Sequence, residues 1–175
     1  ARSVLVPTLA YAASLVPKIA DDPESVDCAM RLGYNWKTGP FELIDKLGPA
    51  WLAAAISEQG LSPPPLLSSV GDGSFYRVRD GRQQQFTGAG YEDIRRPDGV
   101  LLLQDVKRAG SPIARNMSAS LWDIGDGVLC LEFHSKMNSI NPFILSMIEK
   151  AIDLVPGGYR GLVIYNEASN FSVGA

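Results

Sequence analysis

Apolar residues recur at helical spacing through the first third of the chain. Residues 2–19 combine small and apolar side chains with a period close to one helical turn. Prolines at positions 7 and 17 predict a helix that begins or kinks near the first and ends before the second. Asp22-Pro23-Glu24 has the order of an N-cap, a first-turn proline and a first-turn acid, which predicts a helix over 23–32. Its expected inward face consists of Val26, Ala29, Met30 and either Leu32 or Cys28.

Glycine and proline mark an elbow after this helix. Gly33 stands where a helix would end in the left-handed conformation, and Gly39-Pro40 stands where the next would begin with proline at its first position. Apolar residues then continue at helical spacing to Gly48, and a third helix is predicted over 51–59. From the residues alone, such a corner fills the core between two short helices with aromatic rings. The residues expected to build the elbow are Gly33, Trp36, Gly39, Pro40 and Phe41.

The pattern changes from helix to strand after Ser62-Pro63-Pro64-Pro65, which predicts a stiff, extended linker. Residues 75–78 and 82–86 flank Asp80-Gly81, a dipeptide that favours the tight turn of a β-hairpin. A short strand near Tyr91 and the apolar run 100–106 are expected to extend this hairpin into a β-meander.

A second kind of organisation begins near residue 118. Two apolar runs, 119–123 and 128–134, are joined by a glycine-rich turn and predict another hairpin. Asn141-Pro142 predicts the start of a helix that ends at Gly157-Gly158, and residues 162–165 predict a buried strand. The apolar face of that helix is expected to contain Ile144, Leu145, Ile148 and Ile152.

These elements together predict an α+β fold in three parts. A small helical bundle is expected over residues 1–60, a linker with a β-meander over 61–115, and the beginning of an α/β layer over 116–175. A bundle as small as the first part has a marginal core, so its surplus of apolar surface is expected to need a partner.

Composition excludes several classes of function. The chain has 46% hydrophobic and 20% charged residues with a net charge of −3, which is ordinary for a globular protein and gives no basic surface for nucleic acid. The apolar runs are too short to span a bilayer. These short runs, and first residues that do not have the pattern of a signal peptide, favour a cytoplasmic location. Cys28 and Cys130 lie far apart in sequence and outside any paired motif, so we expect reduced core thiols.

Motifs for metals and dinucleotides are weak. His134 is the single histidine, no carboxylates accompany it at ligand spacing, and we therefore expect no metal site and a solvated or core-edge side chain. Gly88-Ala89-Gly90 follows a strand but lacks the third glycine and the helix that a dinucleotide fingerprint requires.

The elbow residues resemble an enzyme family. The segments Ala29-Met30-Arg31-Leu32-Gly33 and Gly39-Pro40-Phe41-Glu42-Leu43, with Trp36, Asp45 and Gly48, closely resemble the signature of the C-terminal helical domain of 3-hydroxyacyl-CoA dehydrogenases. The resemblance covers roughly residues 1–60, and Gly-Pro-Phe-Glu is its most specific part. It implies oxidation of a 3-hydroxyacyl-CoA with NAD in fatty acid degradation, and a homodimer contact through the helical domain.

The end of the chain resembles a second family. Residues 127–133, 136–141, 162–164 and 170–175 are similar to the opening third of an enoyl-CoA hydratase (crotonase) domain. In that family the N–H at the position of Ala175 is one of two backbone donors to the enolate oxygen of an acyl-CoA thioester, so the resemblance implies an oxyanion hole at Ala175 and Gly174. Lys136 is then a candidate contact for the phosphates of CoA, with an ordinary solvated lysine as the alternative.

The order of the two resemblances is that of bacterial fusion proteins in which the dehydrogenase precedes a hydratase-like domain. It implies a parent enzyme that uses NAD and acyl-CoA, in which flanking catalytic domains are partners of this segment. The chain starts inside an apolar pattern, so we expect a central piece of that parent. The nicotinamide domain and the histidine–glutamate pair of the dehydrogenase are not found in this sequence, so we expect no turnover from this piece alone. The alternative is a non-catalytic module for dimerisation or domain assembly.

Overall fold

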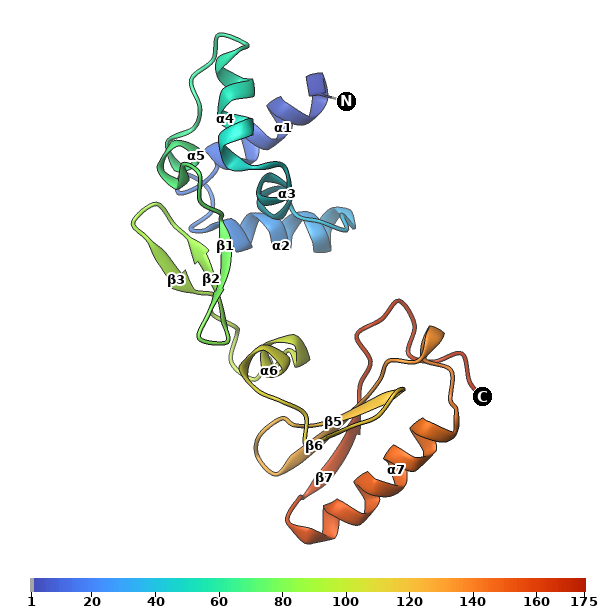
Figure 1. Ribbon diagram of the computed structural model, residues 1–175. Coiled ribbons are helices and arrows are strands. Elements are labelled where there is room, and N and C mark those ends of the chain that lie inside the picture. The colour runs from blue at the N-terminus through green and yellow to red at the C-terminus, as the bar shows by residue number, and fades with distance from the viewer. Residues whose placement is uncertain (1) are drawn as a thin grey trace. The chain divides into compact units, whose positions relative to one another are not determined.

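Residues 2–175 are described by a computed structural model (Figure 1). The chain forms two units, Ala1–Pro97 and Asp98–Ala175, which are called here the N-unit and the C-unit. The three sequence segments predicted above divide at residues 60 and 115, whereas the two units divide between Pro97 and Asp98. Each unit is described by itself.

The N-unit begins with five helices. They are α1 (Arg2–Ser14), α2 (Pro23–Tyr34), α3 (Pro40–Leu47), α4 (Pro49–Ser57) and α5 (Pro65–Val70). Proline occupies the first position of each helix from α2 to α5, where its missing N–H leaves no broken helical bond. The helix predicted within residues 2–19 is confirmed as α1, which ends before Pro17 as predicted and contains Pro7 rather than starting at it.

Helix α5 is absent from the sequence prediction. Residues 61–64 precede it without regular secondary structure, and Pro65 already opens the helix. Six residues are too few to show a clear period, and the helix forms because Leu66, Leu67 and Val70 are all buried.

The predicted end and inward face of α2 are wrong in detail. Gly33 lies inside the helix, and the left-handed residue that closes it is Asn35, with φ of 55°. Asparagine tolerates this conformation through its short polar side chain. The helix turns Pro23, Val26 and Asp27 inward, whereas Ala29 and Leu32 are exposed. A buried aspartate thus lies where the apolar pattern predicted the core.

An antiparallel sheet completes the N-unit. Its strands are β1 (Tyr76–Arg79), β2 (Arg82–Phe86) and β3 (Tyr91–Asp93), in the order β1-β2-β3. The predicted hairpin is confirmed, since Asp80 and Gly81 both have positive φ, as the tight hairpin turn requires. The rings of Phe41 and Phe75 meet edge to face at 4.8 Å and join α3 to the start of this sheet. The largest fully buried side chains of the N-unit core are Leu9, Phe41, Ile44, Leu52, Ile56, Leu67 and Phe75.

The C-unit is a four-stranded sheet with a helix on one face. Its elements are α6 (Leu103–Ala109), β4 (Ala114–Arg115), β5 (Ala119–Asp123), β6 (Val128–Phe133), the 3₁₀ turn η1 (Lys136–Asn138), α7 (Pro142–Leu154), the 3₁₀ turn η2 (Val155–Gly157) and β7 (Gly161–Ile164). The strand order is β4-β5-β6-β7, with β6 and β7 parallel and the other pairs antiparallel. Figure 1 shows α7 lying along the sheet, as the crossover between two parallel strands requires.

The meander predicted through residues 100–106 is wrong at its end. Residues 103–109 form α6, whose Leu103 packs with Trp122 and Cys130. The apolar run looked like a strand because Leu101, Leu102 and Leu103 are consecutive, but only Leu103 of these three is buried.

The predicted start of α7 is confirmed and its face is corrected. Asn141 caps the helix by accepting from the N–H groups of Phe143 and Ile144. The buried stripe is Ile144, Met147 and Ala151, whereas Leu145 and Ile152 are exposed. Strand β7 forms as predicted but is not fully buried, because Val163 and Ile164 are exposed.

No helix among residues 2–175 is both long and apolar enough to cross a membrane.

Candidate functional site

The elbow of the N-unit is organised by the carboxylate of Asp27, a side chain from α2. One oxygen accepts from the N–H of Phe41 at 2.7 Å, and the other accepts from the N–H of Glu42 at 3.0 Å. These are N–H groups of the first turn of α3, which have no partner within their own helix. Gly39, the N-cap of α3, has no side chain to offer them. Asp27 therefore caps α3 from the neighbouring helix.

Gly39 is required by this arrangement. A Cβ at residue 39 would lie 2.3 Å from Cγ and 2.4 Å from Cβ of Asp27, far closer than van der Waals contact. Its backbone conformation is ordinary, with φ of −67°, so the requirement is one of space alone. By contrast, a Cβ at Gly33 would meet no atom within 4 Å.

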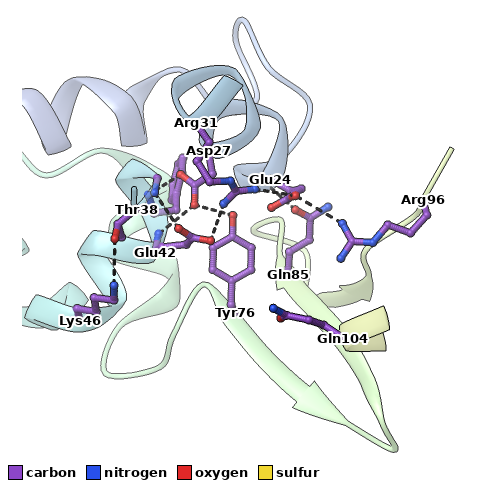
Figure 2. A network of polar contacts seen from close by, with 12 residues as sticks. Glu24, Asp27, Arg31, Thr38, Glu42, Lys46, Tyr76, Gln85, Arg96 and Gln104 are labelled. Carbon is purple, nitrogen blue, oxygen red and sulfur yellow. Dashed lines mark hydrogen bonds and ion pairs between the residues drawn. The ribbon is translucent and has the colours of Figure 1, made fainter. Parts of the chain in front are cut away.

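The carboxylate of Glu42 completes the cap, and Figure 2 shows it near Arg31 and Glu24. Glu42 accepts from the N–H of Gly39 at 2.8 Å, the return bond of a capping box. Arg31 on α2 donates to Glu42 and to Glu24, the latter at 3.0 Å. Glu24 is also 3.6 Å from the guanidinium of Arg96. Arg31 and Glu42, the two members of this network that belong to the signature, thus join α2 to α3.

Burial sets the protonation of this network. It raises the pKa of Asp27 from 3.8 to about 6, although its N–H donors and the Tyr76 hydroxyl, which donates at 2.9 Å, favour the charged form. Burial, together with the charge of Asp27, also raises the pKa of Tyr76, so its hydroxyl remains a donor. Burial likewise raises the pKa of Asp45, whose carboxylate accepts from the N–H of Phe75 at 2.6 Å and of Tyr76 at 2.9 Å.

These contacts give the predicted elbow residues different roles. Gly39, Pro40 and Phe41 are buried at the start of α3, as expected of a structural corner. Trp36 is partly buried, and its backbone N–H donates to the carbonyl of Met30 at 3.3 Å. Gly33 is exposed within α2 and touches none of the capping groups. The Asp27 carboxylate is fully buried and is hydrogen-bonded to the backbone of α3 and to Tyr76, so these contacts join α2, α3 and β1.

The capping aspartate was not found from the sequence. It lies inside a helix, and its partners are 14 and 15 residues away. One signal was available, because Gly39 and Glu42 have the spacing of a capping box and Gly39 cannot supply the acceptor itself. The absence of a side-chain acceptor at the N-cap indicates that another residue must accept from the first N–H groups of α3.

A groove of about 680 Å³ lies beside this network within the N-unit. Its apolar wall includes Cys28, Ala29 and Leu32 on α2 and Ile94, and most of the other lining residues are charged or polar. Leu32 is 82% exposed, so the apolar wall of the groove is open to solvent.

In the C-unit the structure brings Lys136 and the predicted oxyanion residues into neighbouring segments. The carbonyl of Gly174 accepts from the N–H of Ile140 at 2.7 Å. The hydroxyl of Ser172 donates to the carbonyl of Asn138 at 2.6 Å. The turn that carries Lys136 is therefore bonded to the segment that ends at Ala175. The side chain of Lys136 is exposed.

The two predicted oxyanion residues differ in their N–H groups. The N–H of Gly174 donates to the hydroxyl of Ser172 at 3.0 Å and is not free for a ligand. No acceptor among residues 2–175 is bonded to the N–H of Ala175. Ala175 thus has the available donor, and Gly174 supplies the turn, with φ of 92°.

Three titratable side chains of the C-unit, Cys130, Glu132 and His134, come from β6 or the residue that follows it. His134 is exposed, and its Nε2 is 3.1 Å from the hydroxyl of Ser120. Glu132 is buried and accepts from Lys107 at 2.7 Å. Burial raises the pKa of the Cys130 thiol to about 11, which keeps it protonated. Within the described part of the chain, no group of three or more histidine, cysteine or carboxylate side chains is placed to hold a metal ion.

Comparison with known families decides the relationship of this chain. The model of the C-terminal domain of 3-hydroxyacyl-CoA dehydrogenase matches residues 1–91 of the 175. The chain belongs to this family. The matched residues include helices α1 to α5, Asp27 with its hydrogen-bond partners and the β1–β2 hairpin, so the capping arrangement is part of this 3-hydroxyacyl-CoA dehydrogenase domain.

Named relatives extend the similarity beyond that domain. A probable 3-hydroxyacyl-CoA dehydrogenase of Bacillus subtilis (strain 168) is 37% identical over 171 residues, or 96% of this chain and 22% of that protein. Proteins provisionally named fatty acid oxidation complex trifunctional enzyme, from Rickettsia felis and Rickettsia prowazekii, are 28% and 25% identical over 165 residues, which is 94% of this chain and 20% of each relative. The chain thus spans about a fifth of the length of these curated relatives, and their similarity includes the C-unit.

Proposed function

We propose that this chain is part of a 3-hydroxyacyl-CoA dehydrogenase fused to an enoyl-CoA hydratase-like domain that acts in fatty acid β-oxidation. The observation that carries the proposal is the similarity of the dehydrogenase relative over 96% of this chain, which includes both units. The parent would oxidise a 3-hydroxyacyl-CoA with NAD, and its flanking catalytic domains would be the partners of this segment. We also infer a cytoplasmic location, which the two free cysteines support.

In this proposal the C-unit supplies the beginning of an acyl-CoA site. A free backbone N–H at Ala175 can donate to the thioester oxygen and stabilise the negative charge that develops there. Lys136, exposed on the turn bonded to this segment, is the proposed contact for the phosphates of CoA.

The chain alone is proposed to be inactive as a dehydrogenase. That reaction needs a histidine that accepts the hydroxyl proton and a carboxylate that orients it. The single histidine, His134, is hydrogen-bonded to Ser120, and no carboxylate within residues 2–175 is hydrogen-bonded to its ring.

Calorimetric titration with acetoacetyl-CoA tests the proposal, with free CoA as the control. The expected result is thioester-dependent binding without NADH-linked turnover. Equal affinity for the two ligands, or absence of binding by a folded sample, contradicts an acyl site in the C-unit. NADH oxidation by the pure chain contradicts the predicted inactivity. Replacing Lys136 with Ala is expected to weaken both ligands equally, because the phosphates are common to both.

The groove supports a second function for the N-unit, that of a module for dimerisation. Ala29 and Leu32 present an apolar face on α2 that the N-unit leaves uncovered. Sedimentation of the chain is expected to show a dimer that Leu32→Glu dissociates, whereas Ile19→Glu, a change at an equally exposed residue outside the groove, leaves it intact. A monomer at all concentrations contradicts this role.

A further inference from the structure

The turn at Lys136–Asn138 has an unusual backbone. Met137 and Asn138 are consecutive residues with positive φ, at 56° and 52°. Asparagine adopts this conformation readily, but methionine does so rarely, because its Cβ approaches the following carbonyl. Such a turn persists only where surrounding contacts determine it.

Two asparagines supply those contacts by exchanging hydrogen bonds. The side-chain amide of Asn138 donates to the carbonyl of Asn170 at 3.1 Å, and the side-chain amide of Asn170 donates to the carbonyl of Met137 at 3.0 Å. Asn138 is buried, so its amide cannot exchange this partner for water without opening the turn. We call Asn138 and Asn170, with Ser172, the amide clamp.

Ser172 links the amide clamp to the backbone that precedes Ala175. Its hydroxyl donates to the carbonyl of Asn138 at 2.6 Å and accepts from the N–H of Gly174 at 3.0 Å. One side chain therefore fixes both the left-handed turn and the backbone just before Ala175.

These hydrogen bonds fix the orientation of the peptide between Gly174 and Ala175. The carbonyl of Gly174 and the N–H of Ala175 belong to the same planar peptide and point in opposite directions when it is trans. The N–H of Ile140, two residues after the left-handed turn, holds that carbonyl at 2.7 Å. Holding the carbonyl toward Ile140 directs the N–H of Ala175 away from it, toward the side where no protein acceptor is bonded.

We propose that the amide clamp positions the N–H of Ala175 as a donor to the oxygen of an acyl-CoA thioester. Asn138, Asn170 and Ser172 are positioning residues, since they act through the peptide between Gly174 and Ala175 and do not touch the ligand. This inference rests on the proposed function, which names the ligand, while the clamp itself is a property of the chain without ligand.

The experiment uses the full 175-residue chain and four variants. Asn138→Gly keeps the left-handed turn accessible and removes the amide, and Ser172→Ala removes both hydroxyl bonds. Ser172→Thr retains the hydroxyl as a conservative rescue. Ser146→Ala, at an exposed position of α7, is the matched control.

The first measurement is amide hydrogen exchange without ligand, with the ¹H–¹⁵N heteronuclear NOE of Ala175. In Asn138→Gly and Ser172→Ala, exchange at Gly174 and Ile140 is expected to accelerate about tenfold or more, with loss of order at Ala175. Ser172→Thr and Ser146→Ala are expected to match the original chain. Unchanged exchange and order in both disrupted variants overturns the clamp, whatever the chain binds.

The second measurement is the infrared stretching frequency of the thioester carbonyl of [1-¹³C]acetoacetyl-CoA bound to each protein. A hydrogen bond from Ala175 lowers this frequency relative to the free ligand, and the lowering is expected to disappear in Asn138→Gly and Ser172→Ala at ligand concentrations that saturate each variant. If the frequency stays lowered in both variants, the clamp does not position the donor, and the proposed acyl site stands. If the original chain binds the thioester without lowering the frequency, Ala175 is not the donor and the positioning inference fails. If it binds no thioester, the proposed acyl site fails and the exchange data alone decide the clamp.

Discussion

The Asp27 network of the N-unit and the amide clamp of the C-unit solve a similar problem with different chemistry. Each holds a turn that contains a left-handed asparagine, Asn35 in one and Asn138 in the other, and each uses a distant side chain to bind backbone groups. The N-unit uses charges, with Asp27 buried among two N–H groups and a tyrosine hydroxyl. The C-unit uses neutral amides and a hydroxyl. The titratable carboxylate makes the N-unit turn sensitive to pH, and its close approach to Gly39 makes that turn sensitive to added volume, whereas the neutral clamp has no titratable side chain.

The largest effect is expected from Gly39→Ala. The added methyl group would lie on Asp27, forcing the carboxylate away and leaving the first turn of α3 without its cap. Overpacking and loss of a cap together are expected to cost about 3 kcal/mol or more. Urea unfolding of the N-unit, followed by the amide signals of α3, measures this loss.

Gly33→Ala is the matched control for that prediction. Residue 33 lies in helix α2 with open space around it, so alanine should stabilise the N-unit by about 0.5–1 kcal/mol. Two glycines six residues apart are thus expected to respond with opposite sign. Equal destabilisation by both substitutions would show that the close approach of Asp27 is not what requires glycine.

The pH dependence of N-unit stability is the second prediction. Because burial raises the pKa of Asp27 to about 6 in the folded chain, the folded state retains this proton more strongly than the unfolded one. The resulting stabilisation is complete below the unfolded pKa and is lost as pH rises through about 6, a change of about 2–3 kcal/mol. Urea unfolding at a series of pH values between about 4 and 7 measures the slope.

Asp27→Asn should remove this pH slope, because the side chain can no longer ionise. Asp72→Asn, at an exposed position after α5, is the control and should preserve it. The same slope in Asp27→Asn and the original chain would assign the titration to another group, of which Asp45 is the first candidate because burial raises its pKa as well.

The sequence predicted the features that depend on neighbouring residues and missed the contacts between residues that are distant along the chain. Gly39-Pro40 and Asn141-Pro142 were found as helix starts because the information lies within a few residues. Asp27 was not found, since its role depends on the packing of two helices. Asn138 and Asn170 are 32 residues apart, and the sequence contains no sign of their pairing. Gly33 and Asn35 can both close a helix, so the choice between them depends on where the chain must leave α2.

The third prediction concerns the C-unit, where Asn141→Ala removes the cap of α7. The side chain accepts from the N–H groups of Phe143 and Ile144 at 3.1 Å, so its loss is expected to cost about 1 kcal/mol. Asn141→Asp keeps the acceptor and should retain most of the stability, although it loses the donation to Ser118 at 2.9 Å. Urea unfolding followed by the α7 amide signals distinguishes them, and identical losses in the two variants would make the Ser118 contact the important one.

The smallest effects are expected where the left-handed residue itself is replaced by glycine. Met137 is exposed and bears a side chain poorly suited to positive φ, so Met137→Gly should stabilise the C-unit by about 0.5–1 kcal/mol. Asn35→Gly should change the N-unit by only about a few tenths of a kcal/mol, because asparagine already tolerates this conformation. Both substitutions place glycine at a left-handed position, one in place of methionine and the other in place of asparagine. The difference between the two changes in unfolding free energy therefore measures the strain that the amide clamp imposes on Met137. Equal effects would mean that Met137 carries no excess strain, and the clamp would then hold a turn that the chain already prefers.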